Sequence, residues 1–174
     1  MLREGESLVD PRDIRVEDLL SRDAVVTDLA RIQELLAGQR VLVTGAGGSI
    51  GSEIVRQVCR YEPAEVWALD RDETLLHEGG LTWDCDVRPI LADVRDAGAI
   101  GRAFSRIRPQ VVFHAAALKH VPVLEANPEE AALTNVVGTA NVMQAGSLNG
   151  VRRFVLISTD KAVNPTSIMG CTKR

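Results

Sequence analysis

Short apolar runs that alternate with longer amphipathic stretches are the feature that most narrows the fold of this chain. The apolar runs are too short for helices and are bounded by polar residues, so we interpret them as strands. We expect strands at 41–43, 65–69, 87–91, 111–113 and 154–157, and helices at 49–60, 73–78, 97–107 and 128–149, with one more beginning near Thr166. Strands that are apolar throughout are buried on both faces, which indicates an α/β fold with a doubly wound parallel sheet.

The N-terminal residues lack this alternation. We interpret 1–37 as an arm or linker, because it is charged and has only spaced apolar residues. Within the arm, 26–37 has the spacing of a short helix, with its apolar face formed by Leu29, Ile32, Leu35 and Leu36 and its end at Gly38. The predicted organisation is an arm over 1–37 and a folded domain over 38–174.

The composition excludes several classes of protein. Hydrophobic residues make up 45% of the chain, and the net charge of −4 comes without a basic block, which is unlike a nucleic-acid binder. No apolar stretch reaches the roughly 20 residues of a membrane helix, so we expect no direct membrane contact from this chain. Cys59, Cys85 and Cys171 are widely spaced and lack a metal-ligand pattern. We therefore expect no metal, reduced cysteines and a cytoplasmic location.

A glycine-rich turn follows the first predicted strand. Gly45, Gly48 and Gly51 have the spacing GxxGxxG, and Ser49 and Ile50 lie within it at the start of the predicted helix. Glycines let the backbone turn tightly and let a pyrophosphate approach the N-terminus of the helix. Because a strand precedes the motif and a helix follows it, we predict a Rossmann-type domain that binds NAD or NADP. A turn with a purely structural role is the alternative.

Charged residues end the next two predicted strands. Asp70 lies about 20 residues beyond the last glycine, where a carboxylate binds the adenosine ribose, although it could instead be a simple helix cap. Arg71 could pair with a 2′-phosphate, so the choice between NAD and NADP stays open. Asp93 and Val94 are placed to meet the adenine edge, and Asp93 as an ordinary turn residue is the alternative.

Small residues follow the fourth predicted strand. Ala115, Ala116 and Ala117 would let the backbone pack against a cofactor, although such a run also suits tight core packing. We assign Lys119, in the same segment, to the cofactor site. Asn135 on the next predicted helix can hydrogen-bond backbone near this site, or it can lie on a solvated face of the helix.

Polar and ionisable residues come directly after the fifth predicted strand. Ligands bind at the carboxyl ends of strands in open α/β sheets. Thr159, Asp160 and Lys161 are therefore candidates for a catalytic site, with Lys173 following in the next helix. By itself, the Asp160–Lys161 pair could also be a surface ion pair at the start of a loop.

Together these segments resemble the extended short-chain dehydrogenase/reductases. The resemblance is carried by GxxGxxG, by the His-Ala-Ala-Ala of 114–117, by the Asn-Val-Val-Gly-Thr of 135–139 and by Ser158-Thr159. Two longer strings, 114–122 and 158–166, are similar to bacterial capsular-polysaccharide enzymes of the UDP-N-acetylglucosamine 4,6-dehydratase type. The segment 14–20 also resembles the linker that precedes this domain in the large, membrane-anchored members.

The resemblance implies a nucleotide-sugar dehydratase of capsular or surface polysaccharide biosynthesis. In that family NAD(P)⁺ takes a hydride from C4 of the sugar, water is eliminated across C5 and C6, and the hydride returns at C6. By analogy Asp160 protonates the departing C6 oxygen, Lys161 removes the C5 proton and Thr159 hydrogen-bonds the C4 oxygen. Lys173 would hold the nicotinamide ribose. We accordingly expect a UDP-sugar substrate and a homo-oligomer, with the parent protein at the cytoplasmic face of the inner membrane.

Met169 departs from the pattern of most related dehydrogenases, which carry a tyrosine four residues before the lysine. That tyrosine takes the C4 hydroxyl proton, and a thioether cannot do so. Tyr61, the only tyrosine in the chain, is expected at the end of the first helix of the domain and away from the site. The large membrane-anchored branch commonly shows the methionine, so the proton must go elsewhere, to Asp160 or through water.

The chain ends at Arg174, directly after Lys173. Extended members of the family continue well beyond this point, with further strands and the lobe that binds the UDP-sugar. We therefore expect a domain truncated before its substrate-binding lobe. We also expect 1–174 alone to bind cofactor weakly or not at all and to turn over no substrate.

Two other functions fit parts of the pattern. A sugar-nucleotide epimerase shares the fold and the cofactor, although the Asp160–Lys161 pair favours elimination. A non-catalytic dinucleotide-binding module would be consistent with Met169. A purely structural domain would leave the glycine turn without a role.

Overall fold

The structure is a computed structural model that describes residues 28–174. The predicted arm, including the linker-like segment 14–20, therefore lies outside the described residues up to position 27. The chain divides into two units, Met1–Ala30 and Arg31–Arg174, and the sheet belongs to the second. Within 28–174, no helix has the length and apolar character needed to cross a membrane.

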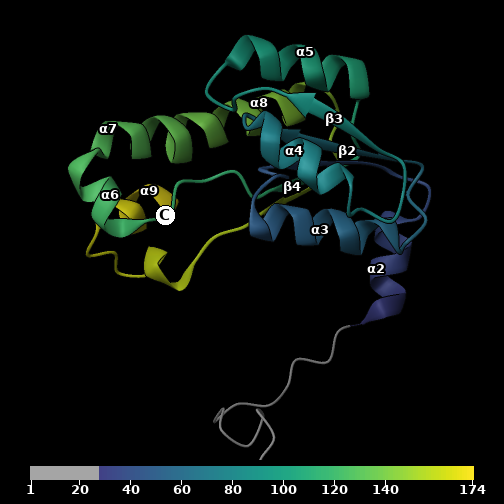
Figure 1. The fold of residues 1–174 in the computed structure, drawn as a ribbon, viewed down its shortest axis with the longest axis horizontal. Helices are drawn as coiled ribbons and strands as arrows, with labels where there is room; N and C mark the ends of the chain where they lie inside the picture. The colour runs from purple at the N-terminus through teal and green to yellow at the C-terminus, as the bar shows by residue number, and fades with distance from the viewer. Residues whose placement is uncertain (1–27) are drawn as a thin grey trace, which may run out of the picture. The chain divides into compact units, whose positions relative to one another are not determined.

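Five parallel strands form one sheet (Figure 1). They are β1 (Arg40–Thr44), β2 (Glu65–Asp70), β3 (Val87–Leu91), β4 (Val111–His114) and β5 (Arg153–Leu156), in the order β3-β2-β1-β4-β5. The central strand β1 pairs with both β2 and β4, so that Val43 lies opposite Ala68 on one side and Phe113 on the other. The strand order reverses between β1 and β4, where sheets of this kind open a crevice for ligands. The predicted Rossmann-type parallel sheet is confirmed.

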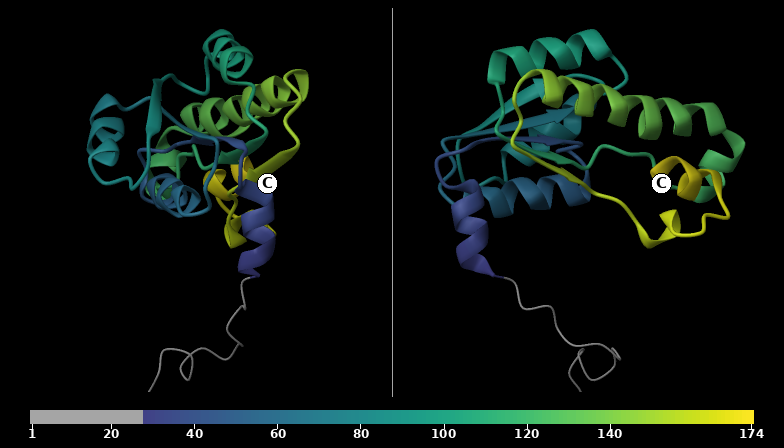
Figure 2. Two further views of the ribbon diagram at one scale, coloured as in Figure 1. Left: turned by 90° about the vertical axis from the view of Figure 1, so that its right-hand side faces the viewer. Right: turned by 180° about the vertical axis from the view of Figure 1, so that it is seen from behind.

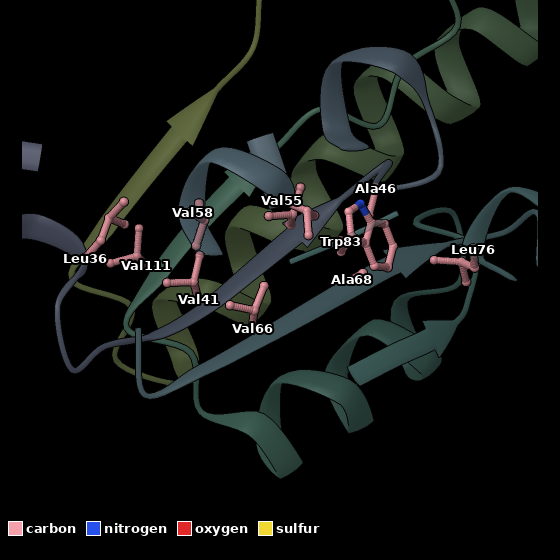
Figure 3. Packing of buried hydrophobic residues seen from close by; sticks show 11 residues of the cluster. Leu36, Val41, Ala46, Val55, Val58, Val66, Ala68, Leu76, Trp83 and Val111 are labelled. Carbon is pink, nitrogen blue, oxygen red and sulfur yellow. The ribbon is translucent and has the colours of Figure 1, made fainter. Parts of the chain in front are cut away.

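One face of the sheet is covered by α3 (Ser49–Cys59) and α4 (Glu73–Gly80), and Leu36 at the end of α2 (Leu29–Leu36) packs into the same cluster. Figure 3 shows the side chains packed there. Strand residues two apart, such as Val41 and Val43, point into this layer because successive side chains alternate between the faces of a strand. The Trp83 ring adds to the layer, and its Nε1 donates a hydrogen bond to Ser52 Oγ at 3.0 Å.

The opposite face is covered by α5 (Ala97–Ile107) and α8 (Thr139–Leu148), which lie across the sheet from α3 (Figure 2). Phe104 of α5 is fully buried against Leu42 and Val112, the strand residues that point away from the first layer. Each fully buried side chain of this size stabilises the fold by about 1.5–3 kcal/mol. Burial on both faces is the reason that the central strands are apolar throughout.

A third, smaller cluster joins three short helices. These are α6 (Val121–Ala126), α7 (Pro128–Ala131) and α9 (Ile168–Lys173), and they lie together beside the main sheet layers in Figure 1. Leu124, Ala131 and Met169 form its buried centre. Met169 is thus part of a local core as well as a neighbour of the predicted catalytic segment.

The helix predicted over 128–149 is interrupted. It consists of α7, a π-helix η2 (Ala132–Gly138) and α8. A π-helix inside an α-helix is frequently found at a functional site. The short helix α6 was not expected, and its Pro122 lies in the first turn, where proline is tolerated. The 3-10 turn η3 (Asp160–Ala162) was also not expected.

Cys59 and Cys85 form a disulfide, so the expectation of reduced cysteines is wrong for this pair. Cys59 ends α3 and Cys85 precedes β3, and their Cα atoms lie 5.5 Å apart. The two residues are separated by 26 positions and meet only because the sheet brings α3 beside β3. Cys171 is free and exposed.

Reduction of this disulfide is expected to lower the free energy of unfolding by about 3 kcal/mol, because the bond shortens the accessible loops of the unfolded chain. The measurement is urea unfolding with and without a dithiol reductant. Cys59→Ser should be destabilised without reductant and insensitive to it. Cys171→Ser is the matched control and should respond to reductant like the wild type; equal stability of reduced and oxidised wild-type protein would contradict the prediction.

Candidate functional site

A cavity of about 250 Å³ lies at the carboxyl ends of the strands, where the strand order reverses. Nine residues predicted to bind cofactor line it: Gly45, Gly48, Asp70, Arg71, Asp93, Val94, Ala115, Ala116 and Ala117. The lining residues that sequence reasoning missed are Leu69, Asp72, Leu75, Ala92, Leu118 and Thr134. Most of these are chain neighbours of the predicted residues, so extending each motif by one or two positions would have found them.

A second cavity of about 380 Å³ adjoins the first, because Ala115, Ala117 and Leu118 line both. The predicted site residues that line it are Ile50, Ala115, Ala117, Lys119, Thr159, Lys161, Met169 and Lys173. Sequence reasoning missed Leu118, His120, Val121, Ile157 and Ser158. The structure thus brings the segments after β4 and β5 together around one space.

Four predicted site residues line neither cavity. Ser49 is the exposed first residue of α3, and Gly51 is buried beneath the glycine turn. Asn135 is buried in η2. Asp160 lies beside the second cavity, with a side chain that is 87% exposed.

The glycines of the turn are required for different reasons. Gly45 has φ +70°, and a Cβ there would lie 2.5 Å from the Ala116 nitrogen, so the segment after β4 excludes other residues from this position. A Cβ on Gly51 would meet the Gly45 carbonyl oxygen at 2.0 Å. A Cβ on Gly48 would touch only that oxygen, at 3.4 Å, and Gly48 lines the first cavity. Protein packing therefore explains Gly45 and Gly51, whereas Gly48 keeps the cavity open.

Asp70 is tied to the glycine turn. Its Oδ2 accepts a hydrogen bond from the Gly47 nitrogen at 2.9 Å, and its Oδ1 accepts one from the Asp72 nitrogen at 3.1 Å. The residue that caps α4 is Asp72, whose side chain accepts from the Leu75 nitrogen. The alternative of Asp70 as the helix cap is therefore wrong, and its carboxylate is held at the edge of the first cavity.

Asp93 is held by arginines. Arg95 Nε lies 2.8 Å from Asp93 Oδ2, and the Arg95 nitrogen donates to Asp93 Oδ1 at 2.9 Å. Arg71 pairs with the same carboxylate more loosely, at 3.8 Å. Burial opposes ionisation of Asp93, but the hydrogen bonds and charge of Arg95 outweigh it and lower the pKa of the carboxyl. Asp93 is therefore both a turn carboxylate and a neighbour of the cavity.

A buried chain of hydrogen bonds connects β1 to η2. Thr44 Oγ1 lies 2.6 Å from His114 Nδ1, and His114 Nε2 lies 2.9 Å from Thr139 Oγ1. Thr139 donates its only hydroxyl proton to the Asn135 carbonyl oxygen at 2.6 Å. Thr139 must then accept from His114 Nε2–H, and Nδ1 accepts from Thr44. Burial, with a smaller contribution from the charge of Lys173, lowers the pKa of His114 to about 4, so the ring is neutral.

Asn135 joins two loops of the second cavity. Its Oδ1 accepts from the Leu118 nitrogen at 2.8 Å, and its Nδ2 donates to the Leu118 carbonyl at 3.1 Å and to Thr172 Oγ1 at 3.0 Å. Leu118 follows β4 and Thr172 precedes Lys173. The alternative of a solvated face is therefore wrong for Asn135, which holds the β4 loop against α9.

Because His114 resists protonation in the folded state, acid should destabilise the protein. Its folded pKa is below that of an unfolded histidine, so the unfolded chain binds the extra proton and stability falls from about pH 6.5 to about 4. The loss should approach about 3 kcal/mol. Urea unfolding across this range should show a steeper pH dependence for the wild type than for His114→Gln. His77→Asn, at an exposed position of α4, is the control, and equal slopes for wild type and His114→Gln would refute the assignment.

The segment after β5 is compact. Thr159 Oγ1 donates to Asp160 Oδ1 at 2.9 Å, and the Lys161 nitrogen donates to the same oxygen at 2.9 Å. Lys161 Nζ lies 3.5 Å from Asp160 Oδ1, and both side chains are largely exposed. The Thr159 hydrogen bond, followed by the charge of Lys161, lowers the pKa of Asp160. This arrangement holds Asp160 as a carboxylate.

Lys173 is fixed more firmly than Lys161. Its Nζ donates to the Ile157 carbonyl oxygen at 2.6 Å, and burial lowers the pKa of the ammonium group. Met169 lies one helical turn earlier, with only 5% of its surface exposed. Tyr61 packs against the first core layer and lines neither cavity, as expected.

Comparison with known proteins places these features in a family. Residues 41–174 match the family described as polysaccharide biosynthesis protein. The chain belongs to this family. It is 46% identical over 169 residues to the "Probable polysaccharide biosynthesis protein EpsC" of Bacillus subtilis, with 94% of this chain and 28% of that protein covered. It is 38% identical over 138 residues to a Campylobacter jejuni UDP-N-acetylglucosamine 4,6-dehydratase (inverting), with 78% of this chain and 41% of that protein covered.

A solved structure supports the same grouping. The Bordetella bronchiseptica enzyme WbmG in complex with NAD has a TM-score of 0.67 and 26% identity, covering 79% of this chain and 47% of that one. It is also known in complex with NAD and UDP. The predicted family membership is confirmed, and the chain spans less than half the length of each of these three proteins.

Proposed function

We propose that the protein, in its longest natural form, is a nucleotide-sugar 4,6-dehydratase of capsular or surface polysaccharide biosynthesis, acting on a substrate of the UDP-N-acetylglucosamine type. The observation that carries the proposal is that Thr159, Lys161 and Lys173 line one cavity that adjoins the glycine-turn cavity. A sugar in the second cavity would therefore lie beside a dinucleotide in the first. The acid and base needed for elimination would come from the segment after β5.

The first cavity fits a dinucleotide cofactor. Gly48 leaves open the space beside the N-terminus of α3, which suits a pyrophosphate. Thr134 lines the same cavity, and its Oγ1 is the one buried side-chain nitrogen or oxygen of residues 28–174 without a hydrogen-bond partner. We propose that Thr134 and Asp70 hold the adenosine part and that Lys173 holds the nicotinamide ribose. NAD(P)⁺, when bound, supplies the site that accepts a hydride from C4 of the sugar and returns it at C6.

The residues after β5 would carry the proton transfers of elimination. Lys161 would remove the C5 proton, and Asp160 would protonate the departing C6 oxygen. To donate a hydrogen bond to the C4 oxygen, Thr159 has to withdraw its only hydroxyl proton from Asp160 Oδ1. That release removes the largest influence that lowers the pKa of Asp160. Substrate binding would thus favour the protonated form of the Asp160 carboxyl, which can donate its proton to the C6 oxygen.

The experiment is product analysis after incubation of the protein with UDP-N-acetylglucosamine and cofactor. A dehydratase releases one water from the sugar, so mass spectrometry should find a dehydrated UDP-sugar whose NMR spectrum contains a 4-keto group. An unchanged mass with inverted configuration at C4 would favour the epimerase. Cofactor binding without any change in the sugar would favour the non-catalytic module.

We propose NAD as the preferred cofactor. The Asp70 carboxylate, fixed by two backbone nitrogens, would accept ribose hydroxyls and repel a 2′-phosphate, while Arg71 is already paired with Asp93. Calorimetric titration should give a lower Kd for NAD than for NADP. Asp70→Ser should weaken NAD and strengthen NADP, shifting the preference by about tenfold or more. A lower Kd for NADP in the wild type would refute this proposal.

Oligomerisation and location are further parts of the proposal. Exposed apolar residues, Leu133, Val136, Val137 and Met143, recur along η2 and α8 and would suit the interface of a homo-oligomer. Light scattering of the purified protein tests this.

We propose a cytoplasmic location, although the Cys59–Cys85 disulfide is unusual for that compartment. The redox state of this pair in intact cells is the relevant measurement.

A further inference from the structure

Oxidation at C4 of a sugar in the second cavity requires a base that accepts the C4 hydroxyl proton. Met169 occupies the position of the usual tyrosine, is buried, and has no group that exchanges a proton. Lys173 Nζ is engaged with the Ile157 carbonyl oxygen at 2.6 Å. The base must therefore be another residue that lines or enters this cavity.

His120 lines the same cavity as Thr159, Lys161 and Met169. Its backbone is fixed, because its carbonyl oxygen accepts hydrogen bonds from the Val123 and Leu124 nitrogens at 3.1 and 3.0 Å, and Leu124 anchors the third cluster. Its side chain does not cap α6 and is exposed. An imidazole on a rigid backbone at the cavity edge is well suited to proton transfer.

The other ionisable groups around this cavity are less suitable. Lys119, Lys161 and Lys173 are the cations that line it. Asp160 is engaged by Thr159 and Lys161 and is assigned to the C6 oxygen. The Glu125 carboxylate accepts a hydrogen bond from the Ile168 nitrogen at 2.8 Å, at the start of α9. Among the described residues that line the cavity, His120 is the one histidine, the residue type that most often acts as a general base.

We propose that His120 is the base that accepts the C4 hydroxyl proton of the sugar in place of the missing tyrosine. The O–H bond of the C4 hydroxyl breaks and an N–H bond forms on the imidazole. The C4 hydrogen leaves as a hydride to an oxidised nicotinamide, and the C4–O bond becomes a carbonyl. The inference rests on the proposed function and assigns one further residue to it.

The first test is kinetic and uses the longest natural form of the protein with UDP-N-acetylglucosamine. His120→Ala should lower kcat about 10²- to 10⁴-fold with little change in KM. Added imidazole should restore part of the rate, which a merely structural role would not permit. His77→Asn, an exposed histidine of α4 outside both cavities, should behave as wild type. The double variant His120→Asn/Met169→Tyr should recover activity relative to His120→Asn.

A second readout does not depend on turnover. The chain has three histidines, so the ring resonances of His120 can be assigned by NMR with the His120→Asn variant. UDP-N-acetylglucosamine should shift these resonances and leave those of His77 unchanged. Wild-type kcat in His120→Ala, or unshifted His120 resonances at saturating ligand, would overturn the inference while leaving the dehydratase proposal intact. A wild-type protein that forms no 4-keto sugar would overturn both.

Discussion

Lys161→Met should form 4-keto product about 10³-fold more slowly than the wild type, in the range lost when a general base is removed. The structure places Lys161 Nζ 3.5 Å from Asp160 Oδ1, at the second cavity, and Lys161 does not line the first cavity. The variant should therefore retain cofactor affinity, since no part of the first cavity changes. Asp160→Asn should cause a loss of similar size, because the amide has no proton to give to the C6 oxygen. The measurements are single-turnover product formation and cofactor titration.

Two control variants distinguish the loss of a catalytic group from the mere loss of a surface charge. Arg152→Met removes an exposed cation just before β5, and Asp84→Asn removes an exposed carboxylate before β3. Both should leave the rate unchanged. If Lys161→Met and Asp160→Asn kept the wild-type rate, the elimination machinery would have to lie elsewhere. If they lost cofactor binding as well, the segment would serve the fold of the first cavity instead.

Two substitutions in the glycine turn should separate protein stability from cofactor binding: Gly51→Ala should lower stability, and Gly48→Thr should weaken cofactor binding. Gly51→Ala places a Cβ 2.0 Å from the Gly45 carbonyl oxygen, so β1 and α3 must separate. We expect a loss of about 3 kcal/mol or more in the free energy of unfolding, as for severe overpacking. Gly48→Thr meets only ordinary contact, and threonine is a favourable N-cap for α3 at the observed φ of −71°. Its stability should stay close to that of the wild type.

The Gly48→Thr side chain would project toward the first cavity, where the pyrophosphate is proposed to bind. We expect its cofactor Kd to rise by about tenfold or more. Urea unfolding and calorimetric titration of both variants test the pair of expectations. A Gly48→Thr protein that binds cofactor like the wild type would show that the pyrophosphate does not approach this residue. A fully stable Gly51→Ala protein would contradict the packing argument.

Much of the fold could be predicted from local sequence patterns. The strand β5 begins one residue earlier than expected, and β1 to β4 differ from the predicted ranges by no more than one residue at either end. For β1, β2 and β4 this agreement follows from burial on both faces, which favours apolar runs, whereas β3 and β5 lie at the edges of the sheet and are more exposed. The glycine turn could be predicted equally well. A Cβ on Gly51 would clash within the turn itself, and a Cβ on Gly45 would clash with the segment after the neighbouring strand β4.

The contacts inside the site could not be predicted as well from the sequence, because they join segments that are distant along the chain. The partners of His114, Thr44 and Thr139, lie 70 and 25 positions away. Thr134 and His120 lie next to the predicted residues Asn135 and Lys119, but the course of η2 and of the loop before α6 brings them to the cavities. Sequence neighbours of a motif can be guessed, whereas a partner across the sheet cannot.

The parallel α/β sheet, the glycine turn, and the polar segment of Thr159, Asp160 and Lys161 after the last strand could therefore be predicted from the amino-acid sequence. Periodicity and strand-end position are local properties, and they are sufficient for these features. Three contacts became known from the folded chain: Cys59 meets Cys85, Asn135 ties the β4 loop to α9, and His120 shares a cavity with Lys161. Those pairings arise from the side-by-side placement of strands in the sheet and of the segments that follow them, which brings together residues that no spacing along the chain relates.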